Sequence, residues 1–418
     1  MMDLLIVGGG AAGLMAAGAA LEQGLRVTVL EHNPSGPGQK LLITGKGRCN
    51  LTNDCDVRTF MEGVRRNPRF LYSSLYAFPP EKAMDLFERL GVALKTERGR
   101  RVFPRSDRAA EVLAALRQYA AGAAFVEGSA TGLLLADGVC TGVEYTKPDG
   151  AAEALPAGAV LLTTGGVSYP ATGSDGSGYT LAKQAGHDIV KPQPSLCSLV
   201  SPDPDCRKMM GLSLKNVTLT LLEDGKPLFT ELGEALFTHF GISGPLVLSA
   251  STYIEDFKKH KYVCEFDLKP ALDEKKLYER LTRDFAALGS HSAQGALEKL
   301  LPHSMRPVAV ERWGLANGAA TRAAQITREE KLALVQLCKH WAVPVTGLGN
   351  LEHAVITSGG VDCKHVDPKT MASRCCQGLY FAGEILDVDG RTGGYNLQIA
   401  WATAQAAARG IAAQMNKK

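Results

Sequence analysis

Residues 4–13 read LLIVGGGAAG, a short apolar run that leads directly into a glycine-rich turn. The alanine- and leucine-rich segment that follows favours a helix as far as residue 23, and Gly24 suits the position just after a helix C-terminus. Residues 26–30 form a second apolar run, which ends at Glu31. Strand, turn, helix and strand in this order predict a βαβ unit with parallel strands.

The turn carries the spacing Gly8-x-Gly10-x-x-Gly13, which is typical of dinucleotide-binding sites. Gly8 allows the tight turn, Gly10 lets the backbone approach a pyrophosphate, and Gly13 lets the helix pack closely on the strand. Free N–H groups and the positive end of the helix dipole favour phosphate there. Glu31 is placed to accept hydrogen bonds from an adenosine ribose, and its charge disfavours NADP at this site.

The fingerprint alone does not separate NAD from FAD, but two later segments favour FAD. Residues 379–384, LYFAGE, resemble the strand ending in Gly-Asp or Gly-Glu that places an acid near the ribityl chain and pyrophosphate in flavoproteins of the glutathione-reductase superfamily. Residues 393–396, GGYN, open the last helix, whose N-terminus could stabilise negative charge on a reduced flavin. The sequence therefore predicts one α/β domain built from both ends of the chain.

A proline-rich stretch at residues 191–206 indicates a domain boundary. We expect residues 1–190 and 343–418 to form a discontinuous FAD-binding Rossmann-like domain. Between them, residues 191–272 are predicted as a β-rich substrate domain and residues 273–342 as a mainly helical insert.

Composition narrows the function further. The 418 residues include 46 Lys and Arg against 43 Asp and Glu, a net charge of +3, which argues against a nucleic-acid partner. The ten cysteines are scattered, the N-terminal segment lacks the features of a secretory signal, and no apolar run is long enough to span a bilayer. These features predict a cytoplasmic enzyme that acts on a small-molecule substrate and has no membrane partner.

Five strings carry a family resemblance: GGGAAGLMAA (8–17), KLLITGKGRCNLTN (40–53), TTGGVSYPATGSDGSGY (163–179), LFTHFGISGP (236–245) and GEILDVDGRTGGYNLQIAWATA (383–404). In these strings the chain resembles the HI-type bacterial flavoproteins, FAD-dependent oxidoreductases that are grouped with aminoacetone oxidases and bile-acid enone reductases. The resemblance implies a bound FAD and a Rossmann-like domain of the glutathione-reductase superfamily type, interrupted by a β-barrel-like plus helical insertion. It leaves the substrate open, because members of the family act on different ones.

The matching strings also imply which residues contact FAD. The expected cofactor-binding set is Gly8, Gly10, Ala11, Ala12, Gly13, Glu31, Lys40, Arg48, Cys49, Asn50, Thr164, Gly165, Gly383, Glu384, Gly394, Asn396 and Leu397.

Cysteine and metal chemistry are less favoured. Cys49 and Cys55 are separated by five residues, whereas the redox pair of disulfide reductases is separated by four, so a packing role near the flavin is favoured over a disulfide. The neighbouring Arg48 could lower the pKa of Cys49. No metal is predicted, because Cys363-x-His365 and the vicinal Cys375-Cys376 lack the usual ligand spacing.

The substrate-side candidate is His239 in the string FTHFGISG, because a histidine can protonate a substrate carbon or polarise a carbonyl near neutral pH. Arg48, Asn50 and Tyr395 are alternative catalytic candidates near the flavin.

The favoured function is NAD(P)H-driven hydride transfer through flavin N5 to an activated C=C bond, such as a steroid- or bile-acid-like enone. No second dinucleotide fingerprint is found, so NADH or NADPH would dock transiently. One alternative is an aminoketone or amine oxidase that uses O2 and releases H2O2. Another is a flavin-binding protein with a regulatory or RNA-linked role.

Overall fold

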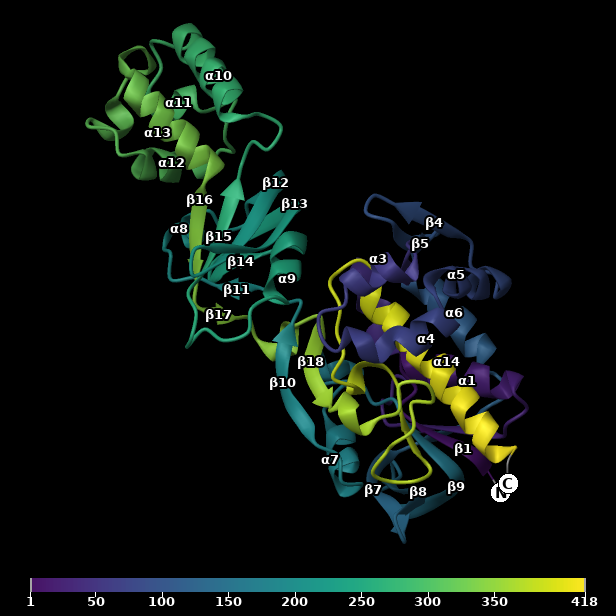
Figure 1. Ribbon diagram of the computed structural model, residues 1–418. Coiled ribbons are helices and arrows are strands. Elements are labelled where there is room, and N and C mark those ends of the chain that lie inside the picture. The colour runs from purple at the N-terminus through teal and green to yellow at the C-terminus, as the bar shows by residue number, and fades with distance from the viewer. Residues whose placement is uncertain (1, 417–418) are drawn as a thin grey trace. The chain divides into compact units, whose positions relative to one another are not determined.

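The computed structural model describes residues 2–416, which form two units (Figure 1). The chain up to Ser195 and from Leu351 onward makes the first unit, and Leu196–Asn350 makes the second. Both junctions lie later than the sequence placed them. The second lies later because residues 343–350 continue the sheet of the second unit: β16 (Trp341–Val345) pairs with β15 (Tyr262–Asp267).

The first unit is built on a seven-stranded sheet in the order β6-β2-β1-β9-β8-β7, with β19 also pairing with β9. Five strands run parallel: β1 (Met2–Val7), β2 (Val27–Glu31), β6 (Ala124–Glu127), β9 (Ala152–Leu162) and β19 (Leu379–Phe381). Two are antiparallel: β7 (Ser129–Ala136) and β8 (Val139–Thr146). This sheet confirms the predicted Rossmann-type α/β fold.

Strand β1 is central because its apolar run can be buried on both faces, as parallel strands require. Leu4, Leu5 and Ile6 are fully buried, and β1 pairs with β2 on one side and β9 on the other. Its neighbours therefore come from widely separated parts of the chain, and the C-terminal β19 joins them through β9.

Two alanine-rich helices pack together in this unit, α1 (Ala11–Glu22) and α14 (Tyr395–Met415) (Figure 1). Most residues of both helices are buried, and many of them are alanines, so neither helix has a wide polar face. The contact joins the two ends of the chain within the first unit, and α6 (Ala109–Tyr119) also packs against α1.

Shorter elements complete the first unit. The helices are α2 (Gln39–Ile43), α3 (Val57–Glu62), α4 (Tyr72–Ala77), α5 (Pro80–Arg89) and α7 (Ser177–Gln184). A small sheet contains β3 (Thr52–Asn53), β5 (Arg101–Pro104) and β4 (Leu94–Glu97), and a ribbon pairs β10 (Ile189–Ser195) with β18 (Ile356–Val361).

The second unit has its own core and a seven-stranded antiparallel sheet in the order β16-β15-β12-β13-β14-β11-β17. The remaining strands are β11 (Leu199–Val200), β12 (Ser213–Glu223), β13 (Lys226–Thr238), β14 (Gly241–Ser243) and β17 (Gly347–Leu348). The helices are α8 (Asp205–Lys208), α9 (Pro245–Ser251), α10 (Glu274–Ala287), α11 (Ala293–Ala296), α12 (Met305–Trp313) and α13 (Arg328–Lys339). Helices α10 to α13 gather at one end of this sheet (Figure 1).

None of the helices within residues 2–416 combines the length and apolar character needed to cross a membrane.

Candidate functional site

The candidate site lies where the parallel strands of the first unit end. Gly8 follows β1, Glu31 ends β2, Thr163 follows β9, and Gly383 lies shortly after β19. The hydroxyl of Thr163 donates to the Gly8 carbonyl at 2.7 Å, which joins two of these ends. Because the carboxyl ends of parallel strands share one edge, this edge is where open α/β sheets bind ligands.

The three fingerprint glycines do different work. Gly8 has a φ of +97° and lies against the Thr163 carbonyl, and a Cβ on Gly13 would lie 2.0 Å from the Gly8 carbonyl oxygen. These two positions therefore admit no side chain. Gly10 has an ordinary φ of −71°, and a Cβ there would meet no described atom within 4 Å. Gly10 thus faces open space at the N-terminus of α1, which has no side-chain cap.

Both carboxylate oxygens of Glu31 accept backbone hydrogen bonds. Oε2 accepts from the Gly9 N–H at 2.7 Å, and Oε1 accepts from the Asn33 N–H at 2.8 Å. Each oxygen keeps a second lone pair that could accept from a ribose hydroxyl. Glu31 therefore braces the glycine-rich turn itself, a role that sequence reasoning missed.

An ion pair links the segments that carry Lys40 and Glu384. The Lys40 Nζ lies 2.7 Å from Glu384 Oε2, and both side chains are about one-fifth exposed. Glu384 Oε1 also accepts from the Ser168 hydroxyl at 3.0 Å and the Thr357 N–H at 2.8 Å. Three other segments of the chain thus contact the Glu384 carboxylate. The sequence singled out Lys40 and Glu384, but gave no reason to expect Ser168 or Thr357.

We expect Lys40→Met to destabilise FAD-free protein by about 1–3 kcal/mol, because a largely desolvated carboxylate loses its cation. Glu384→Gln should recover part of that loss in the double variant, because no unpaired charge then remains. Urea unfolding of both single variants and the double variant measures the coupling energy. A coupling near zero would show that the pair contributes no net stability.

Segments 49–53 and 390–401, far apart in the chain, are held together by hydrogen bonds. The Asn53 amide donates to the Gly393 carbonyl at 2.9 Å, the Thr52 hydroxyl donates to Gln398 at 2.8 Å, and the Trp401 indole donates to the Leu51 carbonyl at 2.8 Å. These bonds bring two of the strings that carry the family resemblance into one place.

Asn50 belongs to the same junction. With its amide oriented to satisfy its neighbours, it accepts from the Gly394 N–H at 3.1 Å and donates to the carbonyls of Thr52 and Val102 at 3.1 and 3.2 Å. Gly394 has a φ of +95°, and a Cβ there would lie 2.2 Å from the Thr52 carbonyl oxygen. Only glycine therefore fits at the start of α14.

The first residues of α14 mainly support the loop before it. The Asn396 amide both donates to and accepts from the Gly390 backbone, at 2.8 and 2.9 Å. The ring of Tyr395 is buried 4.6 Å from that of Phe60, and its hydroxyl accepts from Arg391 at 2.9 Å. Leu397 is half-buried against the core.

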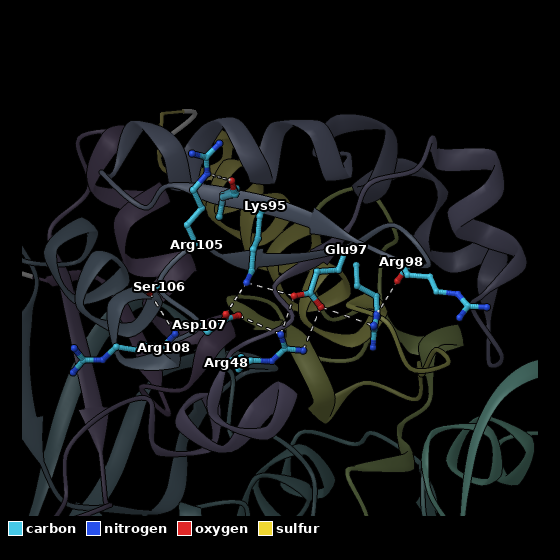
Figure 2. Close-up of polar contacts among 10 residues, drawn as sticks. Arg48, Lys95, Glu97, Arg98, Arg105, Ser106, Asp107 and Arg108 are labelled. Carbon is cyan, nitrogen blue, oxygen red and sulfur yellow. Dashed lines mark hydrogen bonds and ion pairs between the residues drawn. The ribbon is translucent and has the colours of Figure 1, made fainter. Parts of the chain in front are cut away.

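Arg48 is engaged by carboxylates on the β4–β5 side of the unit (Figure 2). Its guanidinium donates to Glu97 at 2.9 Å and to Asp107 at 3.2 Å, and it lies 4.0 Å from the centre of the Phe103 ring. Lys95 joins the network through Asp107 at 2.6 Å. These contacts give Arg48 a positioning role in its loop.

The expected activation of Cys49 is wrong. Its side chain is fully buried, and this burial raises the pKa of the thiol to about 12, although a hydrogen bond with Thr44 acts in the opposite direction. Burial also raises the pKa of Cys55 to about 11. Both thiols are free, as are the other eight cysteines.

Thr164 and Gly165 follow β9 at the same sheet edge. The Thr164 hydroxyl is buried and has no hydrogen-bond partner among the described residues. Gly165 has a φ of +72° and packs against Ser174. At the last strand end, Gly383 packs against α1, where its Cβ would lie 2.7 Å from that of Ala12.

His239 lies in the second unit, on the exposed turn between β13 and β14. Its ring contacts Phe240 with a centroid separation of 5.0 Å.

A buried acid, Asp389, was not expected from the sequence. Its Oδ2 accepts from the Ser195 hydroxyl at 2.7 Å, while Oδ1 has no hydrogen-bond partner among the described residues. Burial raises the pKa of this carboxyl to about 6. The nearby Asp387 pairs with Arg66 at 2.6 Å.

The strand-end residues fit a dinucleotide. The open space at Gly10, the uncapped N-terminus of α1 and the unpartnered Thr164 hydroxyl supply room and donors, while Glu31 supplies an acceptor. This donor and acceptor set suits a pyrophosphate and a ribose.

Comparison with known proteins supports this interpretation. The model of the HI0933-like protein Rossmann domain matches residues 2–410. The chain is 31% identical to the 3-dehydro-bile acid delta(4,6)-reductase of Clostridium scindens, across 97% of this chain and 98% of that protein. It is 30% identical to the ribosomal RNA dihydrouridine synthase of Haemophilus influenzae, across 98% of both chains. A quinol-fumarate reductase structure shares the fold, with a TM-score of 0.52, 16% identity, and coverage of 100% of this chain and 71% of that chain.

Proposed function

This chain belongs to the HI0933-like family of FAD-dependent oxidoreductases, and we propose that it uses NADH or NADPH to reduce a C=C bond conjugated with a carbonyl group. One observation carries the proposal: a sheet edge with open space beside Gly10, which suits a dinucleotide, lies in a chain that matches a delta(4,6)-reductase over 97% of its length. FAD, when bound, supplies hydride transfer at N5.

The names of both curated relatives describe the same kind of bond. A delta(4,6)-reductase removes C=C bonds, and a dihydrouridine synthase saturates the C=C bond of a uracil ring, which is conjugated with a carbonyl. Conjugation makes the C=C carbon farther from the carbonyl group electrophilic. That carbon can accept hydride, while the carbon next to the carbonyl group takes a proton. We therefore propose this bond type as the substrate class, with a steroid-like enone as the leading case.

Our proposed cofactor-binding residues are those of the strand-end site and the junction beside it. Gly10, Ala11 and Ala12 would bind the pyrophosphate through the start of α1, and Glu31 would accept from the adenosine ribose. Two sets of residues would line the rest of the bound FAD. They are Lys40, Thr164, Gly165, Gly383 and Glu384 at the sheet edge, and Asn50, Gly394, Asn396 and Leu397 at the start of α14.

The substrate side rests on fewer residues. His239 stays our candidate for protonating the substrate carbon, because its ring is exposed and histidine exchanges protons near neutral pH. Asn50 stays a candidate for orienting substrate. Arg48 and Tyr395 are weaker candidates, since their polar groups already bond to Glu97 and Arg391.

Anaerobic stopped-flow spectroscopy tests the proposal. NADH or NADPH should bleach the oxidised flavin of the purified protein, and a 3-oxo-Δ4,6 steroid added next should restore its absorbance. Slower restoration in His239→Ala, with unchanged FAD content, would support the proton-donor role. Bleaching by an aminoketone alone, with peroxide formed in air, would replace the reductase with an oxidase.

Uridine in ribosomal RNA is a second candidate substrate, favoured by the Haemophilus influenzae relative and by one surface of this chain. The β4–β5 hairpin and the loop after it carry exposed cations that suit RNA phosphates: Arg98, Arg100, Arg105 and Arg108. The overall charge of +3 predicted no nucleic-acid partner, so the two features point in opposite directions.

One competition assay separates the two substrates. Protein reduced with NADPH is given either the steroid enone or protein-free ribosomal RNA, and flavin reoxidation is followed. Reoxidation by RNA that weakens in an Arg98→Ala/Arg100→Ala variant would favour uridine. Reoxidation by the enone alone would favour the steroid class and leave these arginines as solvated surface.

A further inference from the structure

We propose that His187, His365 and Cys375 form a transition-metal site of the zinc type, separate from the residues assigned to FAD. One ring nitrogen of each histidine and the Cys375 Sγ all lie within 4.8 Å of one another. Zn²⁺ favours imidazole and thiolate ligands, whereas harder cations such as Mg²⁺ favour oxygen ligands. Three protein ligands also leave a fourth tetrahedral position open.

The strongest support for a bound metal is that buried ring nitrogens of the cluster have no hydrogen-bond partner among the described residues. His187 is only 3% exposed, and its Nδ1 is buried with no hydrogen-bond partner among the described residues. The Nδ1 of His365 is in the same condition. A buried ring nitrogen without a hydrogen bond is costly in a protein interior, and a cation bound through these two Nδ1 atoms would satisfy both.

The second ring nitrogen of His187 is already held. Its Nε2 lies 2.7 Å from the Ser373 hydroxyl oxygen, which also accepts from the Cys375 N–H at 3.0 Å. An outer hydrogen bond of this kind fixes the ring and the tautomer of a metal-binding histidine. The same serine therefore orients one ligand and the backbone of another.

The surroundings favour the ligating forms. Burial, together with the neighbouring His365, lowers the pKa of His187 to about 4, so the imidazole is neutral at pH 7 and its lone pair is available. Burial raises the pKa of the Cys375 thiol, but a coordinated dication deprotonates a thiol directly. Asp188 lies 3.8 Å from His365 Nδ1 and is mostly exposed, so it or a water could take the fourth position.

Sequence spacing could not reveal this cluster. His187 follows α7, His365 ends a short turn after β18, and Cys375 lies in the loop before β19. The loop folds back so that the Arg374 N–H donates to the His365 carbonyl at 2.8 Å. A metal would therefore tie the end of α7 to this loop.

Cobalt provides the test. Tag-free, full-length protein with its flavin is dialysed against chelator and titrated with Co²⁺, then with Zn²⁺. We expect one equivalent of Co²⁺ to bind and to give the near-ultraviolet charge-transfer band of a thiolate ligand. Zn²⁺ should displace it and raise the midpoint of thermal unfolding through mass action.

Two serine variants provide the comparison. Cys375→Ser, at an exposed position, should abolish the band and weaken Zn²⁺ binding by at least about tenfold, the low end of what even an outer-shell partner contributes. Cys376→Ser, outside the cluster, should keep both. The proposal fails if wild-type protein binds no stoichiometric Co²⁺, or if the band survives in Cys375→Ser. Because FAD content is recorded in parallel, failure here leaves the flavin proposal untouched.

Discussion

Gly10→Ala is expected to weaken FAD binding and lower the FAD content of the protein while leaving its fold intact. A Cβ at Gly10 meets no described atom within 4 Å, and its φ of −71° suits alanine, so the protein itself tolerates the methyl group. The proposed pyrophosphate would cross the same space. An added methyl in a filled site costs about 1–3 kcal/mol, which is about 5- to 150-fold in FAD affinity.

Two further alanine substitutions make this prediction specific. At Gly13 a Cβ would lie 2.0 Å from a backbone oxygen, so Gly13→Ala should lower both stability and FAD content. At Gly347, in the second unit, the nearest atom is a Val200 side-chain carbon at 3.7 Å, so Gly347→Ala should change neither. Flavin absorbance relative to protein absorbance, with the thermal midpoint, separates the three outcomes. Full FAD content in Gly10→Ala would show that the pyrophosphate does not cross the space beside Gly10.

The same glycines show what the sequence could predict. Local spacing sufficed for the βαβ unit, because strand, turn and helix are consecutive and each glycine has a local geometric reason. The placement of Glu31 was also predictable, since it ends the second strand. Its bonds to the Gly9 and Asn33 N–H groups were not, because they depend on how the turn closes in three dimensions.

Long-range contacts set the limit of sequence reasoning. The motif strings at 40–53 and 383–404 could be recognised, yet not the bonds between them, such as Asn53 to Gly393. Cys49 was expected to be acidified by a neighbouring arginine, whereas burial dominates its pKa and Arg48 bonds to Glu97. Burial depends on the whole fold, so adjacency in the chain was the wrong guide.

Asp389→Asn is expected to stabilise the protein at pH 7 by up to about 3 kcal/mol, since a shift of one pKa unit is about 1.4 kcal/mol. The pKa of Asp389 rises from an ordinary 3.8 to about 6, mainly because burial disfavours the charged form. Below the ordinary pKa, both folded and unfolded chains are protonated at this residue and its contribution is fully present. As pH rises towards 6, the unfolded chain ionises first, so stability falls until the folded carboxyl ionises too.

Asparagine removes this titration. It can still accept from the Ser195 hydroxyl through its amide oxygen, so the variant should lose the fall in stability between pH 4 and 6 that this residue contributes. Thermal midpoints across that range measure the effect, which should reach several degrees at pH 7. Asp85→Asn, at an exposed position on α5, controls for the loss of one negative charge. A variant less stable than wild type at pH 7 would mean that the ionised carboxylate is held by stronger partners than Ser195. In that case the ionised Asp389 would hold the loop before α14, and the interactions of its negative charge would outweigh the free-energy cost of burying it.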